Sequence, residues 1–287
     1  MKSLTAILLL ASLTCCTTVC SQQRSFSLGS FFRSKTIKAS KNYVTKDIRV
    51  DNFANLAVTG SPDVIYTQRS GKPEVKVYTS DNIVDQLDIY VKNNTLYVGF
   101  KKNIRVSYDK LEVRVSSEQL NGITISGSGD VKLPDGLKTD RLKIAIAGSG
   151  DFDGEDISCT DFSLSIAGSG DIESKRIDCN NLQVSVAGSG DVKLNDVKAA
   201  SSKISVAGSG TVVLKGSTQE AEYSVAGSGD LFASDFVAKR VSAKVAGSGD
   251  IKCHATDFLK VRTNGSGSVG YKGNPELDYL KKGLYKL

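Results

Sequence analysis

The sequence has no tryptophan, one methionine and only four prolines in 287 residues. Its single histidine, His254, follows Cys253 without a recognisable nucleophile motif, and we interpret it as a surface side chain. Any Ser-His-Asp or Cys-His mechanism would depend on this one residue. Beyond the N-terminal leader, no segment approaches the 18 consecutive apolar residues typical of a transmembrane helix. We therefore predict no catalytic residue, no metal and no cofactor.

Residues 1–21 are typical of a signal peptide. A basic start, Met1-Lys2, precedes the apolar run Leu4–Leu13, which is too short to cross a bilayer. Val19-Cys20-Ser21 fits a cleavage site. The alternative is a lipoprotein signal in which Cys16 carries the lipid, and a lipid anchor would then be the protein's membrane contact. Both interpretations predict export to the periplasm, the outer membrane surface or the extracellular space.

The formal net charge is +6, from 37 basic and 31 acidic residues. The densest basic clusters lie near the two ends of the chain, at Lys35, Lys38, Lys41 and Lys46 and at Lys281, Lys282 and Lys286. We interpret them as solvated ends, and contact with anionic envelope polymers is the alternative. No segment resembles a nucleic-acid-binding module, so we expect no nucleic-acid partner.

Glycine is abundant, with 27 residues, and it is periodic. Gly-Ser-Gly triplets recur every 18–21 residues, starting at Gly127, Gly148, Gly168, Gly188, Gly208, Gly227, Gly247 and Gly265. A repeat of this length predicts a solenoid with one coil per repeat. Stacked corners about 4.8 Å apart leave no room for side chains, which explains the glycine.

Within a repeat, apolar and polar residues alternate, as in Leu182–Val186. A second short strand, Asp191–Leu194, follows the triplet, and Val197 gives a third apolar point. Alternation of period two indicates strands with one buried face. The sequence therefore predicts an all-β, single-stranded parallel β-helix with about 20 residues per coil.

The N-terminal half is less regular. Residues 22–45 are polar and read as a spacer, and the β-helix is predicted over 46–275 with longer, irregular coils in its N-terminal half. Lys92-Asn93-Asn94-Thr95 is typical of a hairpin turn, and Val58–Val64 reads as a degenerate corner. A separate small β domain is the alternative for this half. Residues 276–287 are predicted to form a C-terminal cap or tail.

The segment "FANLAVTGSPDVIYTQ", the stacked "AGSGD" corners and the closing "NGSGSVGYKG" together resemble the auto-transporter adhesin head domains, also called GIN domains. The resemblance covers about residues 46–275. It implies a secreted or lipid-anchored envelope protein with a β-helical body. It transfers no functional residue, because the activity of that family is largely unassigned.

One carboxylate follows most corners, and the six form a predicted surface ladder: Asp130, Asp151, Asp171, Asp191, Asp230 and Asp250. We interpret each as a cap of its own turn. Cation binding and a polymer-binding face are the alternatives. Thr211 and Ser268 occupy the same position in two repeats and cannot replace a charged ligand.

A second column of residues is predicted on the solvent-exposed face of one strand and consists of Ser165, Ser185, Ser205 and Ser224. It is either a small-residue ladder suited to β stacking or a hydroxyl-rich strip for a partner. Cys159 and Cys179 occupy equal offsets in adjacent repeats, so they form either a disulfide or two buried thiols.

These observations favour an exported cell-envelope β-helical protein with a structural or adhesive role, which presents regular polar faces to a surface glycan or protein. The alternative is a polysaccharide-active enzyme, a lyase or hydrolase, on the same scaffold. A calcium-dependent module is a third hypothesis. The sequence does not determine the oligomeric state.

Overall fold

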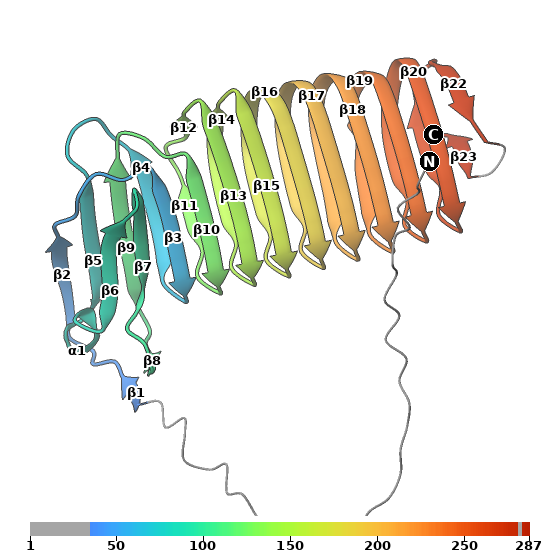
Figure 1. Cartoon of the computed structure of the whole chain (residues 1–287). Coiled ribbons are helices and arrows are strands. Elements are labelled where there is room, and N and C mark those ends of the chain that lie inside the picture. The colour runs from blue at the N-terminus through green and yellow to red at the C-terminus, as the bar shows by residue number, and fades with distance from the viewer. Residues whose placement is uncertain (1–34, 281–282) are drawn as a thin grey trace, which may run out of the picture. The chain divides into compact units, whose positions relative to one another are not determined.

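The computed structural model describes residues 35–280 and 283–287. The predicted signal peptide and residues 22–34 of the predicted spacer lie outside the described residues. Lys35–Leu287 forms one compact unit made almost entirely of strands (Figure 1). Among the described residues, no helix has the length and apolar character needed to span a membrane.

Each coil of the solenoid has a first side that leads into the triplet corner. On this side lie β3 (Asn55–Gly60), β10 (Gly122–Gly127), β13 (Arg141–Gly148) and β15 (Asp161–Gly168). The second side follows the triplet, and its early strands are β4 (Asp63–Gln68), β11 (Val131–Leu133), β12 (Leu137–Lys138) and β14 (Phe152–Ser158).

Later coils join their sides into long strands that bend around the core. These are β16 (Ile172–Gly188), β17 (Val192–Gly208), β18 (Thr211–Gly227), β19 (Asp230–Gly247) and β20 (Ile251–Gly265). Each pairs in parallel with the next, so that Gly188 lies beside Gly208 and Val184 beside Ile204. This confirms the predicted parallel β-helix and its period.

The core is a continuous apolar column inside the coils. In the coil of residues 182–197, six apolar side chains are at most 2% exposed: Leu182, Val184, Val186, Val192, Leu194 and Val197. Larger side chains, including Phe152, Phe162, Tyr66 and Tyr223, fill other coils. Since one coil buries only a few groups, it needs its neighbours to complete both the core and the hydrogen-bond ladder.

The corners show why glycine recurs. At Gly188 the backbone has φ +144°, and an added Cβ would lie 2.2 Å from the carbonyl oxygen of Gly168. An added Cβ at Gly190 would likewise lie 2.2 Å from the carbonyl oxygen of Gly170. Because the obstacle is the backbone of the preceding coil, no rotamer relieves it, and the corner accepts only glycine.

The N-terminal end adds antiparallel pairs to the stack. It contains β1 (Lys35–Lys38), β2 (Tyr43–Ile48), β5 (Glu74–Ser80), α1 (Asp81–Val84), β6 (Leu87–Lys92), β7 (Thr95–Phe100), β8 (Ile104–Ser107) and β9 (Leu111–Ser117). β5 runs antiparallel to β2 and β9, and β6 runs antiparallel to β7. Strand structure therefore starts before residue 46, inside the segment predicted as a spacer.

This end is continuous with the solenoid, since β3 pairs with both β7 and β10 and Gly60 stacks on Gly127. Asn93 and Asn94, with φ of 51° and 59°, form the predicted two-residue hairpin turn between β6 and β7. At the other end, β21 (Val269–Lys272) and β22 (Glu276–Tyr279) pair with β20, and β23 (Leu284–Lys286) pairs with β21. The segment predicted as a cap therefore contributes two strands.

Candidate functional site

The aspartates at the corners join successive coils. The Oδ1 atom of each accepts a hydrogen bond from the backbone N–H at the same position in the next coil. The N–H of Asp151 donates to Asp130 at 2.9 Å. The other bonds are 2.8 Å long, and with the donor named first they join Asp171 with Asp151, Asp191 with Asp171, Thr211 with Asp191, Asp250 with Asp230, and Ser268 with Asp250. The sequence interpretation placed this bond within one turn, whereas the structure places it between coils.

The ladder breaks where the carboxylate is missing. Thr211 offers no carboxylate to the coil above it, and the N–H of Asp230 donates instead to the carbonyl oxygen of Gly210, at 3.2 Å. The six aspartates thus act as inter-coil acceptors. Among the described residues, no group of three or more His, Cys, Asp or Glu side chains is arranged to hold a metal ion. Use of the ladder as a binding surface stays a prediction.

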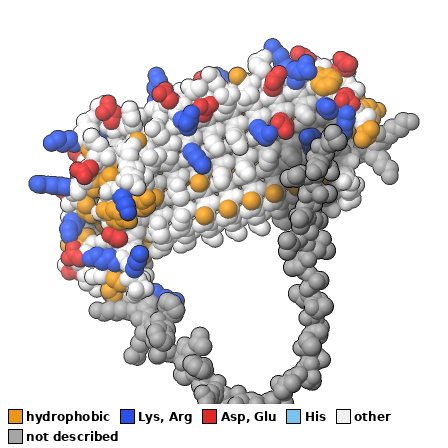
Figure 2. Space-filling view, in the orientation of Figure 1, with side chains coloured by type: hydrophobic (Ala, Val, Ile, Leu, Met, Phe, Trp, Pro, Cys, Tyr) orange, Lys and Arg blue, Asp and Glu red, His pale blue; other side chains and the backbone are white. Residues whose placement is uncertain are grey.

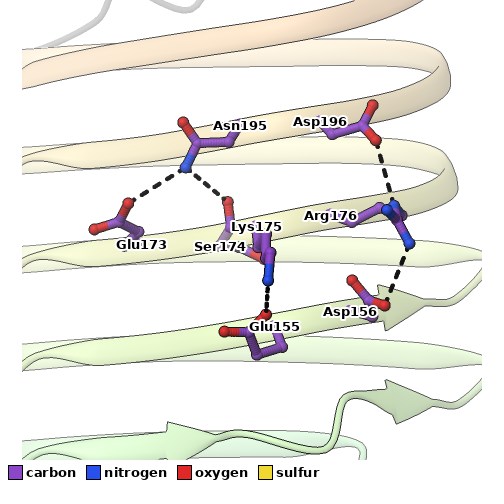
Figure 3. A network of polar contacts seen from close by, with 8 residues as sticks. All are labelled: Glu155, Asp156, Glu173, Ser174, Lys175, Arg176, Asn195 and Asp196. Carbon is purple, nitrogen blue, oxygen red and sulfur yellow. Dashed lines mark hydrogen bonds and ion pairs between the residues drawn. The ribbon is translucent and has the colours of Figure 1, made fainter.

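A bend in the second side, at residues 155–156, 175–176 and 195–196, carries paired charges (Figure 3). Lys175 contacts Glu155 at 2.8 Å, and Arg176 lies between Asp156 and Asp196 at 3.3 Å from each. Such exposed pairs contribute little to stability individually. They neutralise most of the charge at this bend.

Most side chains on the outer surface of the first side are small. Its central row follows the register across neighbouring strands: Tyr90, Tyr97, Ala57, Thr124, Ala145, Ser165, Ser185, Ser205, Ser224, Lys244 and Arg262. The four serines of the predicted column therefore do lie side by side, half-buried.

Beside the central row lies an alanine row of exposed methyl groups: Ala147, Ala167, Ala187, Ala207, Ala226 and Ala246. Figure 2 shows hydrophobic side chains recurring at regular spacing along the stack. On its other flank, a lysine row contains Lys92, Thr95, Asn55, Gly122, Lys143, Ser163, Gln183, Lys203, Glu222, Ser242 and Lys260.

Two tyrosines stack at the N-terminal end of the central row. The ring centroids of Tyr90 and Tyr97 are 5.1 Å apart, with an interplanar angle of 14°, and Tyr90 is 42% exposed. This pair is not among the site residues predicted from the sequence. The sequence nevertheless indicates the pairing, because a two-residue hairpin turn at Asn93-Asn94 places residue 90 beside residue 97.

A second pair, Tyr43 and Tyr78, stacks at 5.7 Å on β2 and β5. The ammonium of Lys110 lies 5.2 Å from the Tyr43 ring centroid. Tyr78 is 38% exposed, close to the value for Tyr90. The two pairs are therefore similar in stacking and exposure but lie on different parts of the sheet.

The thiols of Cys159, Cys179 and Cys253 are free. Cys159 lies beside Cys179, since its N–H donates to the carbonyl oxygen of Asp178 at 3.0 Å. Burial raises the pKa of Cys159 to about 11 and the pKa values of Cys179 and Cys253 to about 12. This suppresses thiolate chemistry. His254 is half-buried on the opposite face of β20 from Cys253.

The family model described as "Putative auto-transporter adhesin, head GIN domain" matches residues 52–212 and 163–275. The chain belongs to this family. The two matches overlap, as expected when coils of equal length allow alignment in more than one register. Among curated proteins, none matches this GIN-domain chain.

Solved structures share the fold of this GIN-domain chain. A "putative adhesin" from Parabacteroides merdae is 24% identical, with a TM-score of 0.68, over 88% of this chain and 96% of that one. A "putative lipid binding protein" from Parabacteroides distasonis is 28% identical, with a TM-score of 0.64, over 85% and 95%. A "putative adhesin" from Bacteroides fragilis is 32% identical, with a TM-score of 0.50, over 87% and 95%.

Proposed function

We propose that this GIN-domain protein is exported and acts at the cell envelope as a non-enzymatic binding protein, with a structural or adhesive role. The outer surface of the first side is its contact face. The observation that carries this proposal is the unbroken register of small, uncharged side chains from Thr124 to Ser224. A surface of this regularity suits an extended partner.

The comparisons support a binding role in two ways. The family is described as an adhesin head domain, and its solved relatives are described as adhesins or as lipid-binding. The predicted leader at residues 1–21 supports export. Periplasmic, outer-membrane and extracellular positions all agree with the proposal.

The carboxylates favour binding over hydrolysis. A glycosidase acid needs a raised carboxyl pKa. The carboxyls whose pKa moves, Asp81, Asp85 and Glu173, all move downward, chiefly because Ser40, Lys46 and Lys193 respectively hydrogen-bond to them. A lowered pKa favours the ionised carboxylate and opposes proton donation.

Export is tested by fractionating cells that express the full chain. We expect the mature protein in the envelope or the medium, with the leader processed. Retention of an unprocessed chain in the cytoplasm would refute the export half of the proposal.

The contact face is tested with Ser205→Glu, which places a larger, charged side chain on the central row. Val213→Glu on the second side is the matched control, since both positions are half-buried. Binding of the full chain to separated envelope polysaccharide, protein and lipid fractions is measured. We expect Ser205→Glu to weaken binding at least tenfold and Val213→Glu to leave it unchanged. Equal effects would remove the first side as the contact face.

A further inference from the structure

The stacked rings of Tyr90 and Tyr97 lie at one end of the central row. The next residue in register is the small Ala57, followed by Thr124. Aromatic rings offer an apolar surface with a polar hydroxyl at the tip. A sugar ring has the complementary character, with apolar C–H groups on its faces and hydroxyls around its edge.

Uncharged hydrogen-bonding groups lie around this tyrosine pair. Asn55 and Thr95 flank it in the lysine row, and Thr124 and Ser126 lie exposed two strands further along. Together with the tyrosines, they offer hydroxyl and amide groups to a polyhydroxylated ligand. Asp88 is the acidic side chain near Tyr90 on this surface.

The charged residues of the central and lysine rows are mostly basic: Lys92, Lys143, Lys203, Lys244, Lys260 and Arg262, against Glu222. Lys92, Lys143 and Lys260 are exposed, and no described acidic side chain forms an ion pair with them. Lys203 is paired with Glu222 at 3.1 Å. The second side instead carries the aspartate ladder. A polyanion is therefore attracted to the first side and repelled by the second.

The surface is also long. Strands about 4.8 Å apart place the two ends of the central row, on β6 and β20, roughly 48 Å apart. Its lysines are spread along this length and do not gather in one pocket. A small anion would meet only one of them, whereas an extended polymer would meet several at once.

From these observations we infer that the partner is a linear anionic polysaccharide that lies along the first side. Tyr90 and Tyr97 stack on a sugar ring at one end, and the lysine row neutralises acidic groups along the chain. This inference rests on the proposed function and names the chemistry of its partner.

The test uses the full exported chain and three linear polyanions: polygalacturonate, alginate and hyaluronate. Dextran is the neutral control, and vesicles of phosphatidylglycerol are the lipid control. Affinity is measured by titration calorimetry at low and high salt. We expect binding to at least one polyanion, at least tenfold weaker in high salt, with no binding to dextran.

Two pairs of variants locate the site. Tyr90→Ser should weaken polyanion binding about tenfold, whereas Tyr78→Ser, which breaks the equivalent stack with Tyr43, should not. Lys143→Gln should weaken binding and reduce its salt dependence, whereas Lys132→Gln on the second side should not. Circular dichroism and melting curves confirm that all four variants fold.

Three results would overturn the inference: equal losses within each pair of variants, binding to none of the polyanions, or binding to the vesicles alone. If Ser205→Glu still weakens capture of an envelope protein or lipid fraction in that case, the proposed function stands and only the polysaccharide assignment fails.

Discussion

At each corner of the stack, a backbone carbonyl oxygen occupies the space that a side chain would need. The left-handed backbone alone costs a non-glycine residue about 1–2 kcal/mol. At Gly188 a close contact with the Gly168 carbonyl oxygen adds to this cost. Substitution there should separate the steric cost from the conformational cost.

We expect Gly188→Ala to destabilise the protein by at least about 3 kcal/mol, since it carries both penalties. Gly71→Ala is the matched control: Gly71 has φ +105°, but nothing lies within 4 Å of an added Cβ. It should lose only about 1–2 kcal/mol. Urea unfolding followed by circular dichroism measures both, and equal losses would contradict the steric argument.

The aspartate ladder allows a second test at this scale. Asp191 accepts from the N–H of Thr211 at 2.8 Å. Asp191→Asn keeps an oxygen acceptor and should cost little, whereas Asp191→Ala leaves the N–H without it and should cost about 0.5–2 kcal/mol, as loss of a helix N-cap does. If Asn were as harmful as Ala, and millimolar calcium raised the melting temperature of the wild type alone, the ladder would bind a cation.

The thiols predict a pH dependence. Burial raises the pKa values of Cys159, Cys179 and Cys253 in the folded state above the ordinary thiol value of about 8.5. Above pH 8.5 the unfolded chain loses thiol protons that the folded chain keeps, so the free energy of unfolding should fall as pH rises toward 11.

Below pH 10, where tyrosine ionisation contributes least, the effect can be measured by denaturant unfolding at pH 7.5, 8.5 and 9.5. A variant with alanine at the three positions should be less stable overall but should show a flatter pH profile. An unchanged slope in that variant would exclude the thiols as the cause.

At the scale of the element, the coil is the structural unit. The register between β16 and β17 is kept at 20 residues throughout, whereas β17 with β18 shows a shift between Leu194 and Val197. There Gly216 lies beside Val197, with φ +125° and no space for a Cβ. A coil one residue shorter is therefore accommodated locally, away from the stacked corners.

Removal of one whole coil should preserve the fold. Deletion of residues 189–208 joins Gly188 to Ser209 and lets β16 pair with β18 through equivalent positions. We expect a cooperative β-sheet protein with a lower melting temperature. Deletion of residues 189–198 should not fold, because it removes the second side of one coil, Val192–Val197, and leaves that coil too short to pass around the core. Circular dichroism and thermal unfolding distinguish the two, and equal behaviour would contradict the coil as the unit.

At the scale of the whole molecule, the two ends of the stack determine whether it stays a single chain. At the C-terminal end β23 pairs with β21, and the side chains of Tyr285 and Leu287 lie over Gly270. Open strand edges recruit other chains. Removing β23 exposes such an edge together with the apolar residues beneath it.

We therefore expect truncation after Leu280 to give concentration-dependent self-association and a lower melting temperature. Light scattering coupled to size-exclusion chromatography measures the association. The matched control is the full chain with Lys286→Gln, which alters charge on β23 but keeps its pairing. A truncated chain that elutes as the control does would show that β23 is not a protective cap.

The sequence by itself determined the coil length, the corners and the buried residues, because each is a local property repeated at a fixed interval. Crowding selects glycine at the corner, and alternation marks the buried side of each strand. The resemblance to the GIN domains followed from the same repeated residues.

Only the tertiary structure decided which residues meet across coils. It showed that Asp171 accepts a hydrogen bond from the backbone of the next coil, and that Tyr90 and Tyr97 continue a row that runs through Ser185. This row joins residues far apart in the chain, and the place of the tyrosines in it depends on the register of the irregular N-terminal strands. That register is set by antiparallel pairing and core packing over many strands, which no local pattern encodes.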